Sequence, residues 1–207
     1  MPVEVWLVFA ATVTAAALTP GPAVLLVVST GLSHGALASI ATNLGVLATN
    51  VVYIAISVAG LSAVMAASPT LFVGLKWIGA AFLVYLGVRA ILTRRGTVAV
   101  AGGHRAATSF LSLFLRGFLS QAVNPKAVIF YGALFPQFLT PAGNVFAESA
   151  LLALSEIVIE FLVLLGYGAL GAQGARLADR PRFAAVTDKV AGTLLIGAGV
   201  GLAALRR

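Results

Sequence analysis

The stretch ALASIATNLGVLATNVVYIAISVAGLSAVMA, residues 36–66, contains no acidic or basic side chain. A transmembrane helix needs about 20 mainly apolar residues to cross about 30 Å of hydrocarbon, and this stretch is longer than that. Five other segments are long and apolar enough to span: Val5–Ser29, Leu71–Leu92, Phe110–Leu139, Phe146–Gly171 and Val186–Leu205. The sequence therefore predicts an all-α membrane protein of about six transmembrane helices, folded as a single domain over residues 1–207.

The composition supports a membrane protein and limits the classes of function. Hydrophobic residues make up 60% of the chain and charged residues 9%, whereas a soluble domain carries about 25% charged residues. The spans leave no room for a soluble catalytic domain, so we expect neither enzyme activity nor a cofactor. The chain has no cysteine, and its two histidines, His34 and His104, are far apart in sequence, which argues against a metal site built on thiolates or imidazoles.

Basic residues gather in two connectors, a loop at residues 94–108 and another at residues 172–185, and the formal net charge is +7. Because these residues stand between apolar segments, they indicate topology and contact with lipid headgroups rather than nucleic-acid binding. The positive-inside rule predicts that both connectors are cytoplasmic and both termini outside. The first segment has Glu4 where a signal peptide would be basic, so we interpret it as a permanent span. If that segment does not span fully, the N-terminus lies inside.

The two halves of the chain resemble each other. An aliphatic residue and a small polar residue precede a proline in Leu18–Pro20 and again in Val123–Pro125. A lysine and a glycine recur at one spacing in Lys76–Gly79 and Lys189–Gly192. These similarities predict two inverted three-helix repeats, at residues 1–93 and 109–207, joined by the basic loop. Chance similarity between apolar helices is the alternative explanation.

Proline within a span interrupts the helix, because it lacks an N–H and clashes with the carbonyl group four residues earlier. Pro20 and Pro22 should free the carbonyls of Ala16 and Leu18, and Pro125 should free the carbonyl of Gln121. These groups then need other partners or a water-filled cavity. We therefore predict broken helices in segments one and four, whose half-helix ends suit a carboxylate and an ammonium group. A structural kink is the alternative.

Four motifs resemble those of the LysE/RhtB family of amino-acid exporters. They are TPGP (Thr19–Pro22), KWIGAAFLVYLG (Lys76–Gly87), NPK (Asn124–Lys126) and ALFPQFLTP (Ala133–Pro141). The resemblance covers essentially the whole chain and implies export of amino acids or related metabolites across the bacterial inner membrane, driven by the proton-motive force. Members usually carry Asn or Asp after TPGP, whereas this chain has Ala23, a difference that bears on the substrate.

The two breaks and the second segment supply the predicted substrate-binding residues. Asn43, Asn50 and Ser57 recur every seven residues, so they lie roughly on one face of the second segment. They could line the path of a substrate, or they could hydrogen-bond between helices. The predicted substrate-binding set is Thr19, Pro20, Gly21, Pro22, Asn43, Asn124, Pro125 and Lys126.

Glu156 and Glu160 lie one helical turn apart within segment five. A charge at the centre of a span costs about 2.5–3.5 kcal/mol, so two carboxyl groups there need a partner, a water cavity or a proton. Two close carboxyl groups tend to share a proton, and we therefore predict that this pair is the proton-coupling site. A structural ion pair with Lys126 or Arg116 is the alternative for the glutamates, and snorkelling to the cytoplasmic interface is the alternative for Lys126.

The sequence thus predicts a proton-coupled exporter with alternating access, in which a bound proton and a bound substrate exclude each other. A metal-cation transporter or channel is the main alternative, because two glutamates are a start toward the oxygen ligands of hard cations. A membrane-embedded enzyme and a structural subunit are weaker alternatives. The small size is compatible with a homodimer. Four aromatic residues are expected to be interface anchors or core residues: Trp6, Trp77, Tyr85 and Tyr131.

Overall fold

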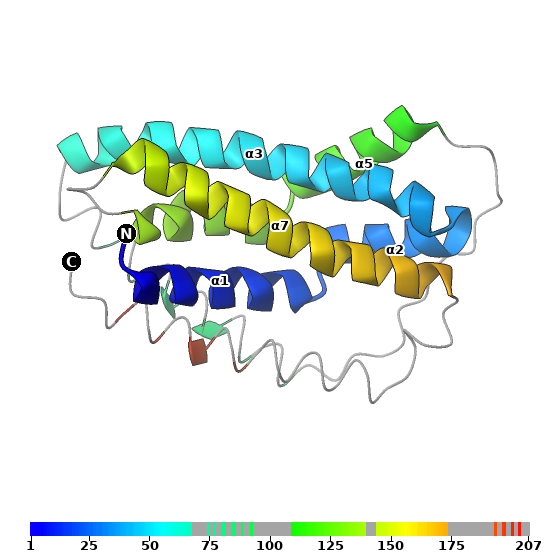
Figure 1. Ribbon diagram of the computed structural model, residues 1–207, viewed down its shortest axis with the longest axis horizontal. Helices are drawn as coiled ribbons and strands as arrows, with labels where there is room; N and C mark the ends of the chain where they lie inside the picture. The colour runs from blue at the N-terminus through cyan, green and yellow to red at the C-terminus, as the bar shows by residue number, and fades with distance from the viewer. Residues whose placement is uncertain are drawn as a thin grey trace.

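The computed structural model describes residues 1–67, 109–139 and 144–173, together with isolated helical positions between residues 74 and 92 and between residues 193 and 203. The described residues form helices and short turns, and no strand occurs among them (Figure 1). Most of predicted segments three and six, and nearly all of both basic connectors, lie outside the described residues. The number of spans, the inverted repeat and the orientation in the membrane therefore stay predictions.

The described elements follow one another with short connections. They are α1 (Val3–Leu18), α2 (Pro22–His34), α3 (Ala36–Ala67), α5 (Phe110–Ala122), α6 (Pro125–Ile129), the π-helix η1 (Phe130–Leu134), the 3-10 helix η2 (Phe135–Phe138) and α7 (Val145–Ala172). Helices α3 and α7 are the long members of the bundle and run side by side (Figure 1). Helix α1 packs along α7 and η2, and α5 packs along α3.

Two described helices are long and apolar enough to cross a membrane, over Ala36–Gly60 and Val145–Ala172. Helices α1 and α2 form a third candidate span when taken together, although they are bent by 55° at the break between them. These elements coincide with predicted segments two, five and one. The coincidence confirms that the protein is helical and membrane-embedded in the part of the chain that the structure describes.

Both breaks lie where the prolines predicted them. Helix α1 ends at Leu18, and α2 begins at Pro22, directly after Gly21. Helix α5 ends at Ala122, and the next helix begins at Pro125, where Asn124 caps it by accepting from the backbone N–H of Lys126 at 3.1 Å. Proline suits the first position of a helix because the N–H it lacks would have no helical partner there.

The first connector is shorter than the sequence predicted. Segment one was expected to end at Ser29, with His34 in a solvated loop, but α2 continues through His34. The chain then turns at Gly35 alone, whose φ of 89° lies in the left-handed region that glycine adopts without strain. Ser33 and the half-buried His34 are joined by a side-chain hydrogen bond at 2.8 Å. The polar residues of this stretch therefore belong to a helix end rather than to a loop.

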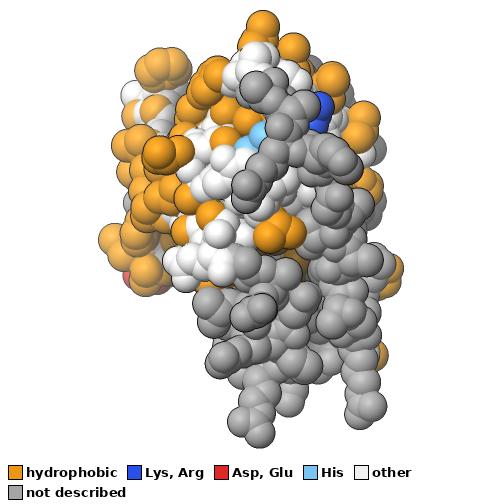
Figure 2. All heavy atoms as spheres, turned by 90° about the vertical axis from the view of Figure 1, so that its right-hand side faces the viewer, with side chains coloured by type: hydrophobic (Ala, Val, Ile, Leu, Met, Phe, Trp, Pro, Cys, Tyr) orange, Lys and Arg blue, Asp and Glu red, His pale blue; other side chains and the backbone are white. Residues whose placement is uncertain are grey.

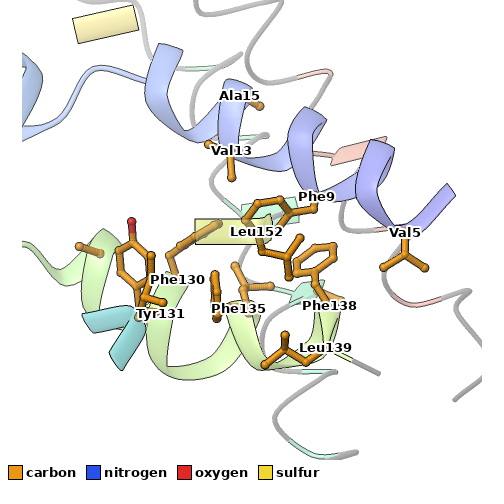
Figure 3. Packing of buried hydrophobic residues seen from close by; sticks show 14 residues of the cluster. Val5, Phe9, Val13, Ala15, Phe130, Tyr131, Phe135, Phe138, Leu139 and Leu152 are labelled. Carbon is orange, nitrogen blue, oxygen red and sulfur yellow. The ribbon is translucent and has the colours of Figure 1, made fainter. Parts of the chain in front are cut away.

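A cluster of aromatic and aliphatic side chains joins α1 to the segment after the second break (Figure 3). Phe9 is fully buried and packs edge-on against Phe135 and Phe138, with ring centroids 5.9 Å and 5.1 Å apart. Leu152 of α7 closes the cluster. Such aromatic pairs contribute about 0.5–1.5 kcal/mol each beyond their buried area. This packing holds η1 and η2 against α1 and so fixes the residues that follow the second break.

The outer surface is apolar, as a lipid-facing surface must be. Leu151, Leu154, Val158 and Leu162 of α7 are each about half exposed and recur at helical spacing. On the opposite side of this helix, Glu156 is buried. Hydrophobic side chains dominate over charged ones on the coloured surface in Figure 2. Helix α7 is therefore apolar toward the outside and polar toward the inside of the bundle, the reverse of a helix on a soluble protein.

Candidate functional site

The two helix breaks meet at Lys126. Its Nζ donates hydrogen bonds to the carbonyl oxygens of Ala16, at 2.8 Å, and of Thr19, at 3.1 Å. Pro20 deprives the Ala16 carbonyl of its usual helical donor, because proline carries no N–H. A side chain on Gly21 would begin 3.8 Å from the same ammonium group. The ammonium group of Lys126 therefore joins the start of α6 to the end of α1, rather than extending to a membrane surface.

The other two carbonyls that the prolines were predicted to free also have donors. The Leu18 carbonyl accepts from the hydroxyl of Tyr167 at 2.9 Å, and the Gln121 carbonyl accepts from the backbone N–H of Asn124 at 3.0 Å. The donors to Ala16 and Leu18 are side chains that come from distant parts of the chain. The prediction that the freed carbonyls need other partners is thus confirmed, and these partners hold the first break in place.

The two glutamates of α7 share one donor. The side-chain amide of Asn50 donates to Glu156 Oε1 at 2.9 Å and to Glu160 Oε2 at 2.7 Å. The hydroxyl of Tyr131 donates to the same Glu156 oxygen at 2.6 Å. Glu156 is only 1% exposed, while Glu160 is half-buried. One amide nitrogen with two hydrogens therefore bridges two carboxyl groups inside the bundle.

A chain of amides links this carboxyl pair to the second break. Gln121 Nε2 donates to Asn50 Oδ1 at 2.7 Å, and Asn124 Nδ2 donates to Gln121 Oε1 at 2.9 Å. The carboxyl pair fixes the direction of the chain, because an ionised carboxylate only accepts, so Asn50 must turn its donor toward it. The cap of α6 and the carboxyl pair of α7 are thereby parts of one hydrogen-bonded unit.

A small cavity lies against these groups. Its volume is about 30 Å³, and its polar lining consists of Gln121, Lys126, Tyr131, Glu156 and Glu160. The remaining lining is apolar and comes from Val13, Ala16, Ala17, Ala127 and Phe130. This volume holds about two water molecules, which is less than any amino acid occupies. The structure is therefore closed around the site, and a solute of that size requires the helices to move apart.

The predicted site residues divide into two groups. The structure brings Lys126, Glu156 and Glu160 to one cavity, with Asn124 attached to it through Gln121. Thr19, Pro20, Gly21, Pro22 and Pro125 form the backbone of the breaks beside it. Asn43 lies elsewhere on α3, where its side-chain amide donates to the carbonyl of Phe161 at 3.1 Å. This hydrogen bond matches the interhelical role that was the alternative for its stripe.

Three residues of the site were not predicted. Asn50 belongs to the stripe that the sequence showed but was not selected, and Gln121 was considered only for its backbone carbonyl. Tyr131 was expected to be an anchor or core residue, but it is 3% exposed and donates to Glu156. The one available signal was position, because Gln121 and Tyr131 flank Pro125 within two helical turns. In the described ranges, no group of three or more His, Asp or Glu side chains is placed to hold a metal ion.

Broken helices in an apolar bundle, with ionisable groups gathered at the breaks, define the class of membrane transporters. The chain belongs to the LysE type translocator family, whose model matches residues 14–206. This membership confirms the resemblance that the TPGP and NPK motifs indicated. It also makes the protein a membrane transporter of an amino-acid efflux family.

Similar proteins cover nearly the whole chain. A homoserine/homoserine lactone efflux protein of Salmonella typhimurium is 30% identical over 100% of this chain and 99% of its own length. A leucine efflux protein of an Enterobacter species is 30% identical over 91% of this chain and 90% of its own. An uncharacterized membrane protein of Vibrio cholerae is 32% identical over 98% of both chains. No solved structure matches the chain.

Proposed function

We propose that this protein exports amino acids or closely related small metabolites across the bacterial inner membrane in exchange for protons. The observation that carries the proposal is the cavity where Lys126, Glu156 and Glu160 lie together beside the two helix breaks. The names of the relatives support the substrate class, because they include homoserine, its lactone and leucine.

The charges of the cavity match those of an amino acid. Lys126 supplies a cation for the substrate carboxylate, and the Glu156–Glu160 pair supplies a negative charge for the substrate ammonium. In the proposal the substrate lies between Thr19–Pro22 and Asn124–Lys126 once the bundle has opened. Backbone groups at helix ends add partners there, since the N-terminal end of a helix favours an anion. The apolar lining from α1 is suited to a small uncharged side chain.

Coupling follows from competition for the same carboxyl groups. Two carboxylates bridged by one amide repel each other in a medium of low dielectric constant, so the pair holds either a proton or a cationic partner. A substrate ammonium that binds the pair displaces the proton, and a proton that binds it displaces the ammonium. Mutual exclusion of this kind is a negative coupling between two ligands, and it makes the export of one depend on the import of the other.

The membrane arrangement belongs to the same proposal. Two inverted repeats, at residues 1–93 and 109–207, would open the site to one side at a time by moving against each other. The basic connectors would be cytoplasmic, so that α3 begins and α7 ends on the cytoplasmic side. A homodimer is compatible with this arrangement and requires no residue of the site to be shared.

Efflux from proteoliposomes tests the proposal. Purified protein is reconstituted into vesicles preloaded with labelled amino acids, including leucine and homoserine, and efflux is followed with and without an imposed pH gradient. We expect efflux of one or a few amino acids that depends on the gradient. Replacing both glutamates, as Glu156→Gln and Glu160→Gln, should abolish this dependence. The exposed Glu4→Gln variant is the matched control and should behave as the unmodified protein. Gradient-driven efflux that survives the double replacement would refute the proton-coupling role.

A further inference from the structure

Four buried side-chain polar atoms have no hydrogen-bond partner among the described residues, and all four lie on α3 or α7. They are Asn43 Oδ1 and Ser57 Oγ on α3, and Ser149 Oγ and Glu156 Oε2 on α7. Each of these residues is at most 7% exposed. Buried polar atoms are nearly always bonded to protein or to ordered water. Their concentration on one pair of helices therefore indicates a hydrated feature rather than scattered packing defects.

The register of the two helices places these atoms along one seam. Helices α3 and α7 run antiparallel, because Asn43 bonds to Phe161 and Asn50 bonds to Glu156 and Glu160. Seven residues further along α3 come Ser57 and, by the same register, the segment of α7 that contains Ser149. A seven-residue step along a helix is about 10 Å. Both serines therefore lie toward the end of the bundle where α3 ends and α7 begins (Figure 1).

We propose that the α3–α7 seam is the proton path of this transporter, leading from the end that holds Ser57 and Ser149 to the carboxyl group of Glu156. The proposal rests on the proposed function, since it assigns the route by which the coupling proton arrives. The positive-inside prediction makes that end of the bundle the extracytoplasmic one, from which the proton-motive force drives protons inward. Asn43 Oδ1 continues the same seam toward the opposite end.

The chemistry of the groups supports a path on this side of the carboxyl pair. A hydroxyl group and a water molecule each donate and accept at once, so a file of them passes a proton by successive hops. Each hop breaks one O–H bond and forms another on the next oxygen, and the last one protonates Glu156. Asn50 and Tyr131 both occupy Glu156 Oε1, which leaves Oε2 as the oxygen that receives the proton. The amides of Gln121 and Asn124 position the pair but do not carry protons at neutral pH.

The charged and titratable groups around the path have definite places. Glu160 shares the Asn50 donor with Glu156, and Lys126 of α6 lines the cavity on the other side. Tyr131 of η1 donates to Glu156, and Tyr53 of α3 stacks on Tyr131 at 5.6 Å between ring centroids. At the serine end, Glu148 forms an ion pair of 2.9 Å with the N-terminal amine of α1, and this pair carries no net charge.

The test compares transport that needs protons with transport that does not. The double variant Ser57→Ala and Ser149→Ala removes both hydroxyls with little change in volume. In proteoliposomes loaded with leucine or homoserine, we expect its pH-gradient-driven efflux, and the associated proton uptake reported by a pH-sensitive dye, to fall severalfold. Exchange of internal for external substrate should stay at the unmodified rate, because it returns the site loaded in both directions. Ser155→Ala is the matched control on α7, since its hydroxyl already donates to the Leu151 carbonyl at 2.8 Å.

The outcomes separate the path from the proposed function. Unchanged proton-driven efflux in the double variant would overturn the seam as the path while leaving the exporter intact. An equal loss of driven efflux and of exchange would also overturn it, because the serines would then serve only the fold. If the unmodified protein moves no protons with either substrate, the antiport mechanism fails and the path fails with it.

Discussion

Lys126 in the second broken helix donates a 2.8 Å hydrogen bond to the backbone carbonyl of Ala16 in the first. The two residues are 110 positions apart in the chain, yet each depends on a proline next to its own break. Pro20 leaves the Ala16 carbonyl without a helical donor, and Pro125 starts the helix that presents Lys126. One ammonium group therefore makes the two halves of the protein interdependent at the site.

Replacing Lys126 should impair both transport and stability. Lys126→Met keeps the length of the side chain but leaves the Ala16 and Thr19 carbonyls without this donor, at a cost of about 1–3 kcal/mol for a buried group. We expect efflux to be lost and the melting temperature of the purified protein to fall. Lys126→Arg is the control, because it retains the positive charge and should retain part of both. Efflux at the unmodified rate in Lys126→Met would remove this residue from the site.

Replacing Pro20 should straighten the first break. Pro20→Ala restores an N–H that can bond the Ala16 carbonyl, so it competes with Lys126 and reduces the 55° bend between α1 and α2. We expect slower efflux without a loss of folded protein. Pro22→Ala is the matched control, because Pro22 is the first residue of α2, where a missing N–H has no helical partner. If both variants transport alike, the open Ala16 carbonyl has no role in transport.

Replacing Gly31 should separate α2 from α7. A Cβ on Gly31 would fall on the carbonyl oxygen of Gly168, which is backbone and cannot turn aside. Close approach of this kind is how helices associate in lipid, where apolar side chains gain little by leaving the hydrocarbon. We expect Gly31→Ala to destabilise the protein by about 1–3 kcal/mol, measured by thermal unfolding in detergent. Gly60→Ala is the control, because open space surrounds its Cβ position and alanine favours the helix. Equal melting temperatures would contradict a tight α2–α7 contact.

The sequence predicted those parts of the site that depend on local chemistry. Proline positions located both breaks, and the spacing of Glu156 and Glu160 placed them on one helix face. The partners of these groups depend on the register of helices far apart in sequence, which no local pattern specifies. Asn43 and Asn50 occupy the same stripe, yet only Asn50 lies opposite the glutamates. Gln121 and Tyr131 reach the site because the chain reverses at Pro125, and their composition alone gives no sign of it.

Tyr53 and Tyr131 provide the sharpest test of the carboxyl pair, because they stack on each other but use their hydroxyls differently. Tyr131 donates to Glu156 at 2.6 Å, whereas Tyr53 donates to the backbone carbonyl of Ala122 at the same distance. A hydrogen bond to a charged group contributes about 1.5–3 kcal/mol. Tyr131→Phe keeps the ring and its packing and removes only the donor to the carboxyl group. We expect proton-driven efflux to fall by about tenfold, which corresponds to a change of about 1.4 kcal/mol.

Substrate exchange should fall less in Tyr131→Phe, since exchange does not require Glu156 to take up a proton. Tyr53→Phe loses a hydrogen bond of the same length in the same aromatic stack, but this bond supports the end of α5 and not a titrating group. That variant should melt at a slightly lower temperature and retain its response to the pH gradient. Because the two variants differ only in which acceptor loses its donor, a similar fall in driven efflux for both would assign the effect to packing. A fall confined to Tyr131→Phe would assign it to the carboxyl group of Glu156.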